Sequence, residues 1–349
     1  MTTYRIDPLS DARWSQFLDR HPDASIFHTP GWLKALYRTY GFEPVVYTTS
    51  GPGQDLTNGV PFCRINSWLT GQRLISLPFA DHCQPLVDQP EVLQDVLRTL
   101  ENDCKTAQWK YIQLRPLRVD GDLIERHTHF GGTSDEFFHA MPLGIDEQDL
   151  FRGLHKSCVQ RPIRRAAREG FTYEEGISEA LLAKFYQLLV MTRRRHQIPP
   201  QPIIWFRNLI DCLGDRLKIR VASKDGKPIA SIITLSYQKS VVYKYGCSDP
   251  KHYNLGGMIA LLWQAIQEAK KQGADYFDLG RSARSNTGLV EFKDRWGASR
   301  SPLTYYKYPM MRGSPTTEGW KMHLANHIFS RLPDRILTAA GNVLYRHIE

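Results

Sequence analysis

The chain has 349 residues, of which 42% are hydrophobic and 23% charged, a composition that excludes disordered and fibrous proteins. No apolar run approaches the roughly 20 residues that a membrane-spanning helix needs, and the charged N-terminus lacks the apolar core of a signal peptide, so a cytoplasmic location is expected. The net charge of +9 favours an anionic partner such as a nucleic acid or a phosphorylated donor, although solubility alone also explains such an excess.

The first half of the chain is predicted to form one α/β unit. Strands are expected at 45–49, 60–65 and 74–79, where apolar residues gather between turn-rich stretches. A helix follows at 91–105, because apolar residues recur there at helical spacing. The unit closes with a strand at 111–114.

The second half repeats this order. Strands are predicted at 217–222, 228–237 and 241–246, a helix at 258–272 that Gly273 ends, and a closing strand at 276–280. A repeated order of elements indicates a duplicated unit. The fold class is therefore α/β (α+β).

A basic helical segment separates the two units. Helices are expected at 149–155, at 162–169 with Pro162 in the first turn, and after Ser178, a favourable N-cap. The domain boundary is placed near Gly144.

The prediction is an N-terminal domain at 1–144, a catalytic domain at 145–308 and a tail at 309–349. The tail contains an amphipathic stretch (His323, Ile328, Leu332, Ile336 and Leu344) that is expected to pack back on the body as a helix.

The six cysteines are widely spread and form no spacing typical of a zinc site. Reduced thiols are therefore favoured over disulfides, and no metal site is expected.

A glycine pair, Gly256-Gly257, stands where the helix 258–272 begins, shortly after Asn254. The first N–H groups of a helix and its dipole attract pyrophosphate or a developing oxyanion. A glycine pair that only forms a turn is the alternative.

Charged side chains follow the strand 276–280. Asp278 and Arg281 stand at its end, and Lys293 comes a little later. Strand ends are where α/β sheets carry their sites. The alternatives are a salt bridge from Asp278 that anchors a turn and a solvated surface lysine.

Arginines form two clusters. Arg164 and Arg168 lie one turn apart on the helix from Pro162, and Arg194 belongs to a run at the end of the helix after Ser178. Both clusters suit phosphates, and a solvated face is the alternative.

Three motifs follow one another between residues 243 and 297. They are Tyr243-x-Tyr-Gly246, Phe277-Asp-Leu-Gly-Arg281 and Phe292-Lys-x-x-Trp-Gly297. In this order and spacing they resemble the C-terminal signature of the FemAB-like (Fem-type) branch of the GNAT acyltransferase superfamily. With similar stretches upstream, the resemblance covers about residues 27–308.

The resemblance implies two tandem GNAT-like domains, each a mixed, mostly antiparallel sheet flanked by helices. Members of the family form an amide bond between an activated carboxyl group and an amine acceptor. The donor stays open among aminoacyl-tRNA, acyl-CoA and acyl-carrier protein. Before residue 258 only Asn254-x-Gly256-Gly257 remains of the usual GNAT pyrophosphate loop, which argues against plain acetyl-CoA.

The resemblance, the chemistry of amide formation and the residue patterns above together suggest roles for single residues. Lys293 matches a lysine that stabilises charge on the reacting carbonyl, helped by N–H groups near Gly246. Asp278 is expected to act as base or positioning group, and Tyr243 or Tyr245 as the acid for the leaving group, with packing as the alternative for the tyrosines. Donor binding is expected of Asn254, Gly256, Gly257 and Arg281, and phosphate or substrate binding of Lys34, Arg164, Arg168 and Arg194.

A second hypothesis belongs to another class of protein. A degenerate GNAT fold that binds RNA or another anion without catalysis fits the same charge. No pattern identifies the acceptor or the oligomeric state.

Overall fold

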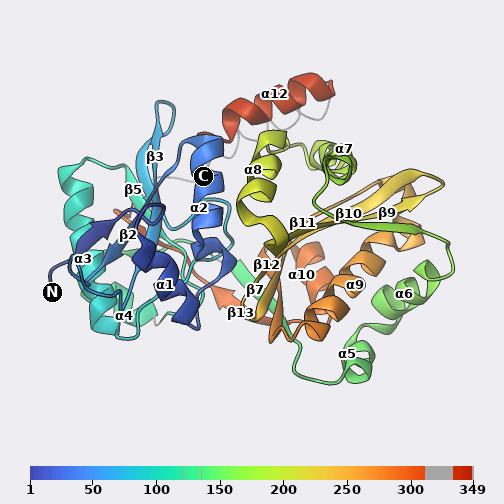
Figure 1. Ribbon diagram of the computed structural model, residues 1–349, viewed down its shortest axis with the longest axis horizontal. Helices are drawn as coiled ribbons and strands as arrows, with labels where there is room; N and C mark the ends of the chain where they lie inside the picture. Colours follow the sequence, from blue (N-terminus) through green and yellow to red (C-terminus); the bar gives the residue numbers. More distant parts are fainter. Residues whose placement is uncertain (120, 135, 311–332, 348–349) are drawn as a thin grey trace. The chain divides into compact units, whose positions relative to one another are not determined.

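A computed structural model describes residues 1–119, 121–134, 136–310 and 333–347 of the chain. The chain divides into two compact units, each with a seven-stranded sheet flanked by helices (Figure 1). Of the described residues, the first unit comprises those within 1–136, 302–310 and 344–347, and the second comprises those within 137–301 and 333–343.

The sheet of the first unit has the order β1-β2-β3-β4-β5-β14-β6. Its strands are β1 (Tyr4–Ile6), β2 (Glu43–Thr48), β3 (Val60–Ser67), β4 (Gly71–Ile75), β5 (Tyr111–Leu114), β14 (Tyr306–Tyr308) and β6 (Gly131–Gly132). Neighbours are antiparallel except β4 and β5, which run parallel. Two antiparallel strands can share a short turn, but the parallel step requires a crossover, which a helix supplies.

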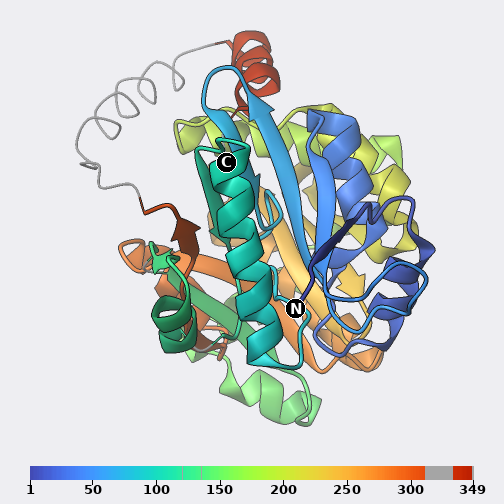
Figure 2. The ribbon, with the colours of Figure 1, turned by 90° about the vertical axis from the view of Figure 1, so that its left-hand side faces the viewer.

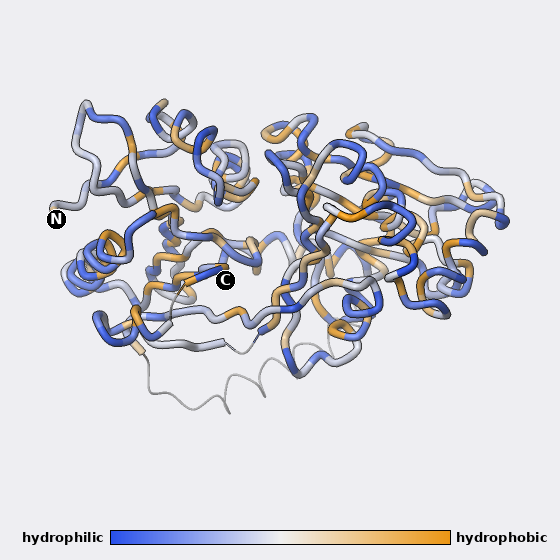
Figure 3. Tube along the Cα trace, turned by 90° about the horizontal axis from the view of Figure 1, so that it is seen from below, coloured by the Kyte–Doolittle hydropathy of each residue, from blue (hydrophilic) through white to orange (hydrophobic). Residues whose placement is uncertain are grey.

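That crossover helix is α3 (Pro90–Thr106), which lies along one face of the sheet (Figure 2). The other helices of the unit are α1 (Ala12–Arg20), η1 (Ile26–His28), α2 (Pro30–Tyr40) and α4 (Gly121–His127). The apolar face of α3 is buried against the sheet, with Val96, Leu97 and Leu100 fully covered. Hydrophobic positions (orange in Figure 3) recur between hydrophilic ones along the chain, as such one-sided burial requires.

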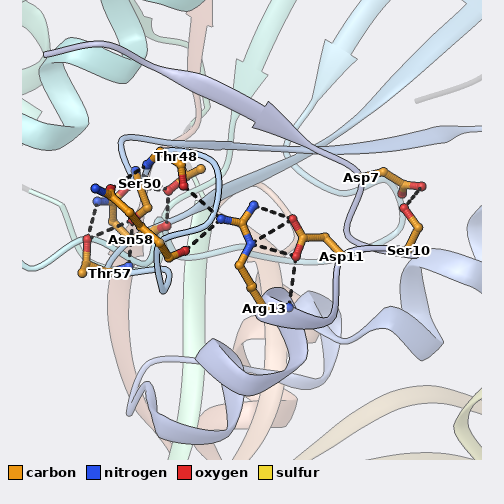
Figure 4. Close-up of polar contacts among 10 residues, drawn as sticks. Asp7, Ser10, Asp11, Arg13, Thr48, Ser50, Thr57 and Asn58 are labelled. Atoms are coloured by element: carbon orange, nitrogen blue, oxygen red, sulfur yellow. Dashed lines mark hydrogen bonds and ion pairs between the residues drawn. The ribbon is translucent and has the colours of Figure 1, made fainter.

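Polar contacts fix the beginning of α1 (Figure 4). The carboxylate of Asp11 caps the helix and accepts hydrogen bonds from Arg13, with Nη2 2.7 Å from Oδ2. Arg13 Nη1 also donates to the carbonyl oxygens of Gly51 (3.0 Å) and Gln54 (2.8 Å). The helix start is thereby held to the loop after β2.

The sheet of the second unit has the order β13-β7-β12-β11-β10-β9-β8. Its strands are β13 (Ser299–Leu303), β7 (Glu136–Pro142), β12 (Tyr276–Ala283), β11 (Ser240–Ser248), β10 (Lys227–Tyr237), β9 (Leu217–Lys224) and β8 (Thr172–Gly176). Strands β8 to β11 are antiparallel, and β11 and β12 are parallel.

Helices cover both faces of this second sheet (Figure 1). One face carries α7 (Glu179–Arg195) and α8 (Ile203–Leu213), and the other carries α9 (Gly257–Lys271) with α5 (Glu147–Gly153) and α6 (Arg161–Ala166). The remaining short elements are η2 (Lys156–Gln160), η3 (Gly214–Arg216), η4 (Pro250–Leu255) and α10 (Thr287–Asp294). On the α7/α8 face Phe185, Phe206 and Tyr245 pack edge to face.

These two sheets confirm the predicted fold class and the repeated order of elements. The strand expected at 74–79 ends earlier, at Ile75, because Leu77 (φ 56°) and Phe79 (φ 59°) adopt left-handed backbone conformations that no strand contains. The helix expected at 162–169 ends at Ala166. Several elements were not predicted, among them strands β7 and β8 and helices α1, α2 and α8.

Each sheet receives one strand from beyond the predicted domain limits. Strand β7 precedes Gly144 but pairs in the second unit, and β14 lies within 145–308 but pairs in the first. Strand pairing follows hydrogen bonding in space rather than order along the chain. The domain limits at Gly144 and Tyr308 stay predictions.

The tail is described from residue 333 to 347. There α12 (Asp334–Leu344) buries Leu337 and places Gly341 against the carbonyl of Pro200, so this part packs on the second unit, while Ile336 is exposed. The predicted positions His323, Ile328 and Leu332 lie outside the described residues.

None of the helices in the described part of the chain is both long enough and apolar enough to cross a membrane. None of the six cysteines forms a disulfide, and all six lie within the described residues.

Candidate active site

A large pocket opens on the α9 face of the second unit. Its volume is about 790 Å³. The described residues that line it are Ser157, Arg161, Pro162, Arg164, Arg165, Arg168, Glu169 and Asn254. Arg164, Arg168 and Asn254 were predicted separately, two from a charge cluster and one from a loop motif, and the fold brings them to one pocket. We call this the arginine pocket.

The arginine pocket is strongly positive. Its one carboxylate among the described lining residues, Glu169, accepts a hydrogen bond from Arg165 Nε at 2.8 Å. The guanidinium of Arg164 stacks over the ring of Phe151 with its carbon 5.4 Å from the centroid, which holds it in place. Guanidinium groups in this density favour phosphates, which they bind through paired hydrogen bonds.

Helix α9 begins beside this pocket. Gly256 precedes the helix with φ +81°, and a Cβ there would lie 3.0 Å from the carbonyl oxygen of Pro162. A Cβ on Gly257 would lie 3.1 Å from Ile229 Cδ1. The glycine pair therefore has a packing role, and it also leaves the first N–H groups of α9 close to Asn254, the residue that lines the pocket.

Strands β11 and β12 of the second sheet run parallel and then part from each other. Strands β11 and β12 are paired at three positions, of which the last joins Val242 to Asp278. Beyond this last pair both strands continue, β11 over 243–248 and β12 over 279–283, but they are no longer paired with each other. We call this opening the strand gap.

A β-bulge lies on the β11 side of the strand gap. Ile233 of β10 faces Tyr245 and the next residue, Thr234, faces Tyr243, so the register passes over Lys244. The extra residue reverses the usual alternation. Tyr243 packs on the α9 face and Tyr245 on the α7/α8 face.

The two tyrosines are thus separated. The hydroxyl of Tyr243 lies 3.8 Å from Met258 Sδ, and the ring covers Gly246, where a Cβ would fall 1.8 Å from that hydroxyl. Burial raises the pKa of Tyr243, which makes it a poor acid. The hydroxyl of Tyr245 accepts a hydrogen bond from Trp205 Nε1 at 2.9 Å.

Asp278 and Lys293 converge on one backbone kink in β12. Asp278 Oδ1 accepts from the N–H of Gly280 at 2.6 Å, and Lys293 Nζ donates to the carbonyl oxygens of Gly280 (3.0 Å) and Arg281 (2.7 Å). Gly280 has φ +73°, which turns two successive carbonyls toward one ammonium. Both side chains are buried, with Asp278 1% and Lys293 3% exposed. The alternative of a solvated surface lysine is therefore wrong for Lys293.

A buried histidine beside this kink was missed by the sequence analysis. His139 of β7 is fully buried, with Nε2 3.5 Å from Oδ1 of Asp294. Burial lowers the pKa of His139 to about 4, and the positive charge of Lys293 acts in the same direction. The imidazole is therefore neutral at physiological pH. No signal pointed to it, because β7 itself was not predicted and a single histidine has no pattern.

Besides the two glycines, three charged residues that were predicted to bind donor or substrate are not among those that line the arginine pocket. Lys34 is exposed on α2 in the first unit, Arg194 of α7 forms an ion pair with Asp334, and the side chain of Arg281 is exposed. The contribution of Arg281 here is its carbonyl oxygen, which holds Lys293.

A family model described as an acetyltransferase (GNAT) domain matches residues 152–294. This stretch contains the arginine pocket, the β-bulge and both members of the Asp278–Lys293 pair.

One relative is a UDP-N-acetylmuramoylpentapeptide-lysine N(6)-alanyltransferase from Weissella viridescens, 30% identical over 149 residues, or 42% of this chain. The match spans only 43% of that relative's length. Among solved structures, FemX superposes with a TM-score of 0.71 at 13% identity over 93% of this chain and all of that chain. A tandem GNAT protein from the clavulanic acid biosynthesis pathway gives 0.57 at 8% identity, over 90% of this chain and 99% of its own.

At such low identities the solved structures establish the fold alone. Together with the family model and the curated relative, they confirm the resemblance that the motifs indicated. Residues 152–294 thus resemble a GNAT acetyltransferase domain, and the comparisons support the likeness of the chain to the FemAB-like branch of the GNAT acyltransferase superfamily.

Proposed function

We propose that the chain is an N-acyltransferase that joins an activated carboxyl group to an amine, with the donor's phosphates bound in the arginine pocket. One observation carries this proposal. Arg164, Arg168 and Asn254 line a single positive pocket beside the start of α9, next to the β-bulge strand of the same sheet. A pocket of about 790 Å³ has room for a nucleotide-sized group.

In this proposal the donor's carbonyl lies in the strand gap. The amine nitrogen attacks the acyl carbon, the carbon–oxygen or carbon–sulfur bond to the donor breaks, and the amine's proton goes to solvent or to the leaving group. The transient oxyanion is stabilised by N–H groups around Gly246 and Cys247 of β11 and by the ammonium of Lys293. Asp278 acts as a positioning group, because its contact with Gly280 shapes the kink that Lys293 binds.

The donor belongs to one of three phosphate-bearing classes: acyl-CoA, acyl-carrier protein or aminoacyl-tRNA. The acceptor is a small-molecule or precursor amine. The alanyltransferase relative supports an acceptor of this kind, since its name states that it modifies a lysine amine of a nucleotide-linked peptide. The cytoplasmic location stays a prediction.

The test is transfer by the purified full-length chain. Each donor class is incubated with a panel of amines, and the products are identified by mass spectrometry. A tRNA donor predicts activity that ribonuclease abolishes and that falls steeply with salt, whereas a thioester donor predicts no effect of ribonuclease. No amide product with any donor contradicts the proposal and favours the non-catalytic RNA- or anion-binding protein.

Variants connect the activity to the arginine pocket. Arg164→Gln with Arg168→Gln is expected to weaken donor binding about tenfold or more and, for RNA, to reduce the salt slope by about two, because each arginine neutralises about one phosphate. The control is Arg207→Gln, which removes an exposed arginine that pairs with Glu179. If the double variant and the control bind the donor equally well, the donor's phosphates bind at a surface other than the arginine pocket.

A further inference from the structure

A second, smaller pocket lies on the α7/α8 face of the second unit, against the β-bulge. Its volume is about 180 Å³, room for about six water molecules at roughly 30 Å³ each. The described residues that line it are Leu189, Thr192, Arg193, His196, Lys244, Tyr245 and Gly246. We call it the bulge pocket. It borders the β11 stretch that forms one wall of the strand gap, but on the sheet face opposite to the arginine pocket.

The end of α7 is fixed against β11 at this pocket. Thr192 Oγ1 donates to the carbonyl oxygen of Ser248 (3.4 Å) and accepts from its N–H (3.1 Å). The next residue, Arg193, donates from Nη2 to Gln201 Oε1 at 3.2 Å. Arg193 is thereby held at the pocket, and Nζ of the bulge residue Lys244 lies 5.8 Å from the centroid of the Tyr245 ring, which also lines it.

The charge of the bulge pocket is one-sided. Its basic side chains are Arg193 and Lys244, and none of the described lining residues is a carboxylate. Burial and the neighbouring arginines, Arg195 and Arg193, lower the pKa of His196, so it adds no charge at neutral pH. Leu189 and the ring of Tyr245 supply apolar wall. Cations around a small apolar-walled space favour an anion of small size.

An amine acceptor must lose its proton before it attacks, and nearby cations disfavour the ammonium form. The same cations attract a carboxylate if the acceptor carries one. We infer, on the basis of the proposed function, that the bulge pocket binds the acceptor and that this acceptor is an amino-acid-type amine whose carboxylate pairs with Arg193 and Lys244. The new bond forms between its nitrogen and the donor's acyl carbon, and the carboxylate is unchanged.

The test compares matched amines without any donor present. Binding of L-lysine and L-alanine is measured by ligand-observed NMR beside 1,5-diaminopentane and ethylamine, which lack the carboxylate, and beside acetate and phosphate. We expect the amino acids to bind at least tenfold more tightly than every other probe. Equal binding of the plain amines, or of acetate or phosphate alone, overturns the inference.

Variants complete the test. Arg193→Gln and Lys244→Gln are each expected to weaken amino-acid binding about tenfold, Arg193→Lys to recover most of it, and the surface control Lys239→Gln to leave it unchanged. If Arg193→Lys binds as poorly as Arg193→Gln, the side chain acts through packing and the inference fails. Because no donor is used, this binding test and the transfer assay have separate outcomes. Absence of amino-acid binding overturns this inference without contradicting transferase activity, and absence of transfer contradicts the proposed function without contradicting amino-acid binding.

Discussion

The corresponding crossover helices of the two units begin in different ways. In the first unit α3 follows Gln89, which makes no side-chain cap, and starts with Pro90, which has no N–H to offer. In the second unit α9 starts at the pair Gly256 and Gly257, beside the arginine pocket. Both helices connect parallel strands that are paired at three positions. The fold was repeated, but the helix start suited to an anion is found in the second unit.

The stretch beyond the parallel pair differs as well. In the first unit Ser76 donates its N–H to the carbonyl of Gln113 (2.8 Å) and Cys83 to that of Arg115 (2.6 Å), so hydrogen bonds continue past the strands. The buried Arg115 also donates to the carbonyl of Ala80 at 3.2 Å. In the second unit the corresponding strands diverge around a bulge. Similar topology thus carries a closed region in one unit and the candidate site in the other.

The largest effect is expected from Lys293→Met. Turnover should fall about a hundredfold or more because the oxyanion loses a charge, and the free energy of unfolding should fall by about 1–3 kcal/mol because two buried carbonyls lose their donor. Arg115→Met is the matched change in the first unit and is expected to affect stability alone. Steady-state kinetics and urea unfolding measure both. Normal turnover by a folded Lys293→Met variant would contradict the proposed role of Lys293 in stabilising the oxyanion.

A second comparison uses one buried histidine from each unit. Burial lowers the pKa of His28 and of His139 to about 4. The unfolded chain therefore binds protons on these groups below about pH 6.5 while the folded chain does not, so stability is fully present above pH 6.5 and falls toward pH 4. Each histidine accounts for a loss of up to about 3 kcal/mol.

Urea unfolding at steps between pH 7.5 and 4.5 measures this loss. His28→Asn and His139→Asn should each flatten the pH dependence, and the surface change His127→Gln should not. A pH dependence that all three variants share with the parent protein would mean that other groups cause it.

A smaller effect is expected from substituting two glycines that both adopt a left-handed backbone conformation. Gly41 (φ +73°) has open space around it, and Gly256 (φ +81°) lies against Pro162. Gly41→Ala and Gly256→Ala should each cost about 1–2 kcal/mol of stability from backbone strain. Only Gly256→Ala should also weaken donor binding, measured by calorimetry. Equal donor affinity of the two variants would show that the start of α9 does not contribute to donor binding.

The smallest effect is expected from Tyr245→Phe. Loss of the hydroxyl leaves the buried indole N–H of Trp205 without that acceptor, which should cost about 1 kcal/mol, with turnover reduced less than tenfold. Thermal unfolding and steady-state kinetics measure the two quantities. A loss of turnover well beyond tenfold at unchanged folding would instead support Tyr245 as the acid that was predicted from the motif.

The amino-acid sequence by itself determined most of the secondary structure that carries the site. Helix α9 and strands β9 to β12 follow from local spacing of apolar residues, because a helix or strand that buries one face must repeat them with its own period. The order of motifs around Asp278 and Lys293 was sufficient to indicate the resemblance to FemAB-like GNAT proteins that the comparisons support. The arginines were visible as clusters, since charge along a helix is a local property.

Tertiary structure decided the partners of those residues. The bulge at Lys244, which separates Tyr243 from Tyr245, exists only in the register between β10 and β11. The burial of Lys293 depends on its reach to Gly280 across the turn from β12 to α10, and that of His139 depends on a strand that joins the sheet from the far side of the domain boundary. Such contacts arise from pairing between segments that are distant in the chain. The local spacing of apolar residues predicts a helix or a strand but does not indicate which other segment will pair with it.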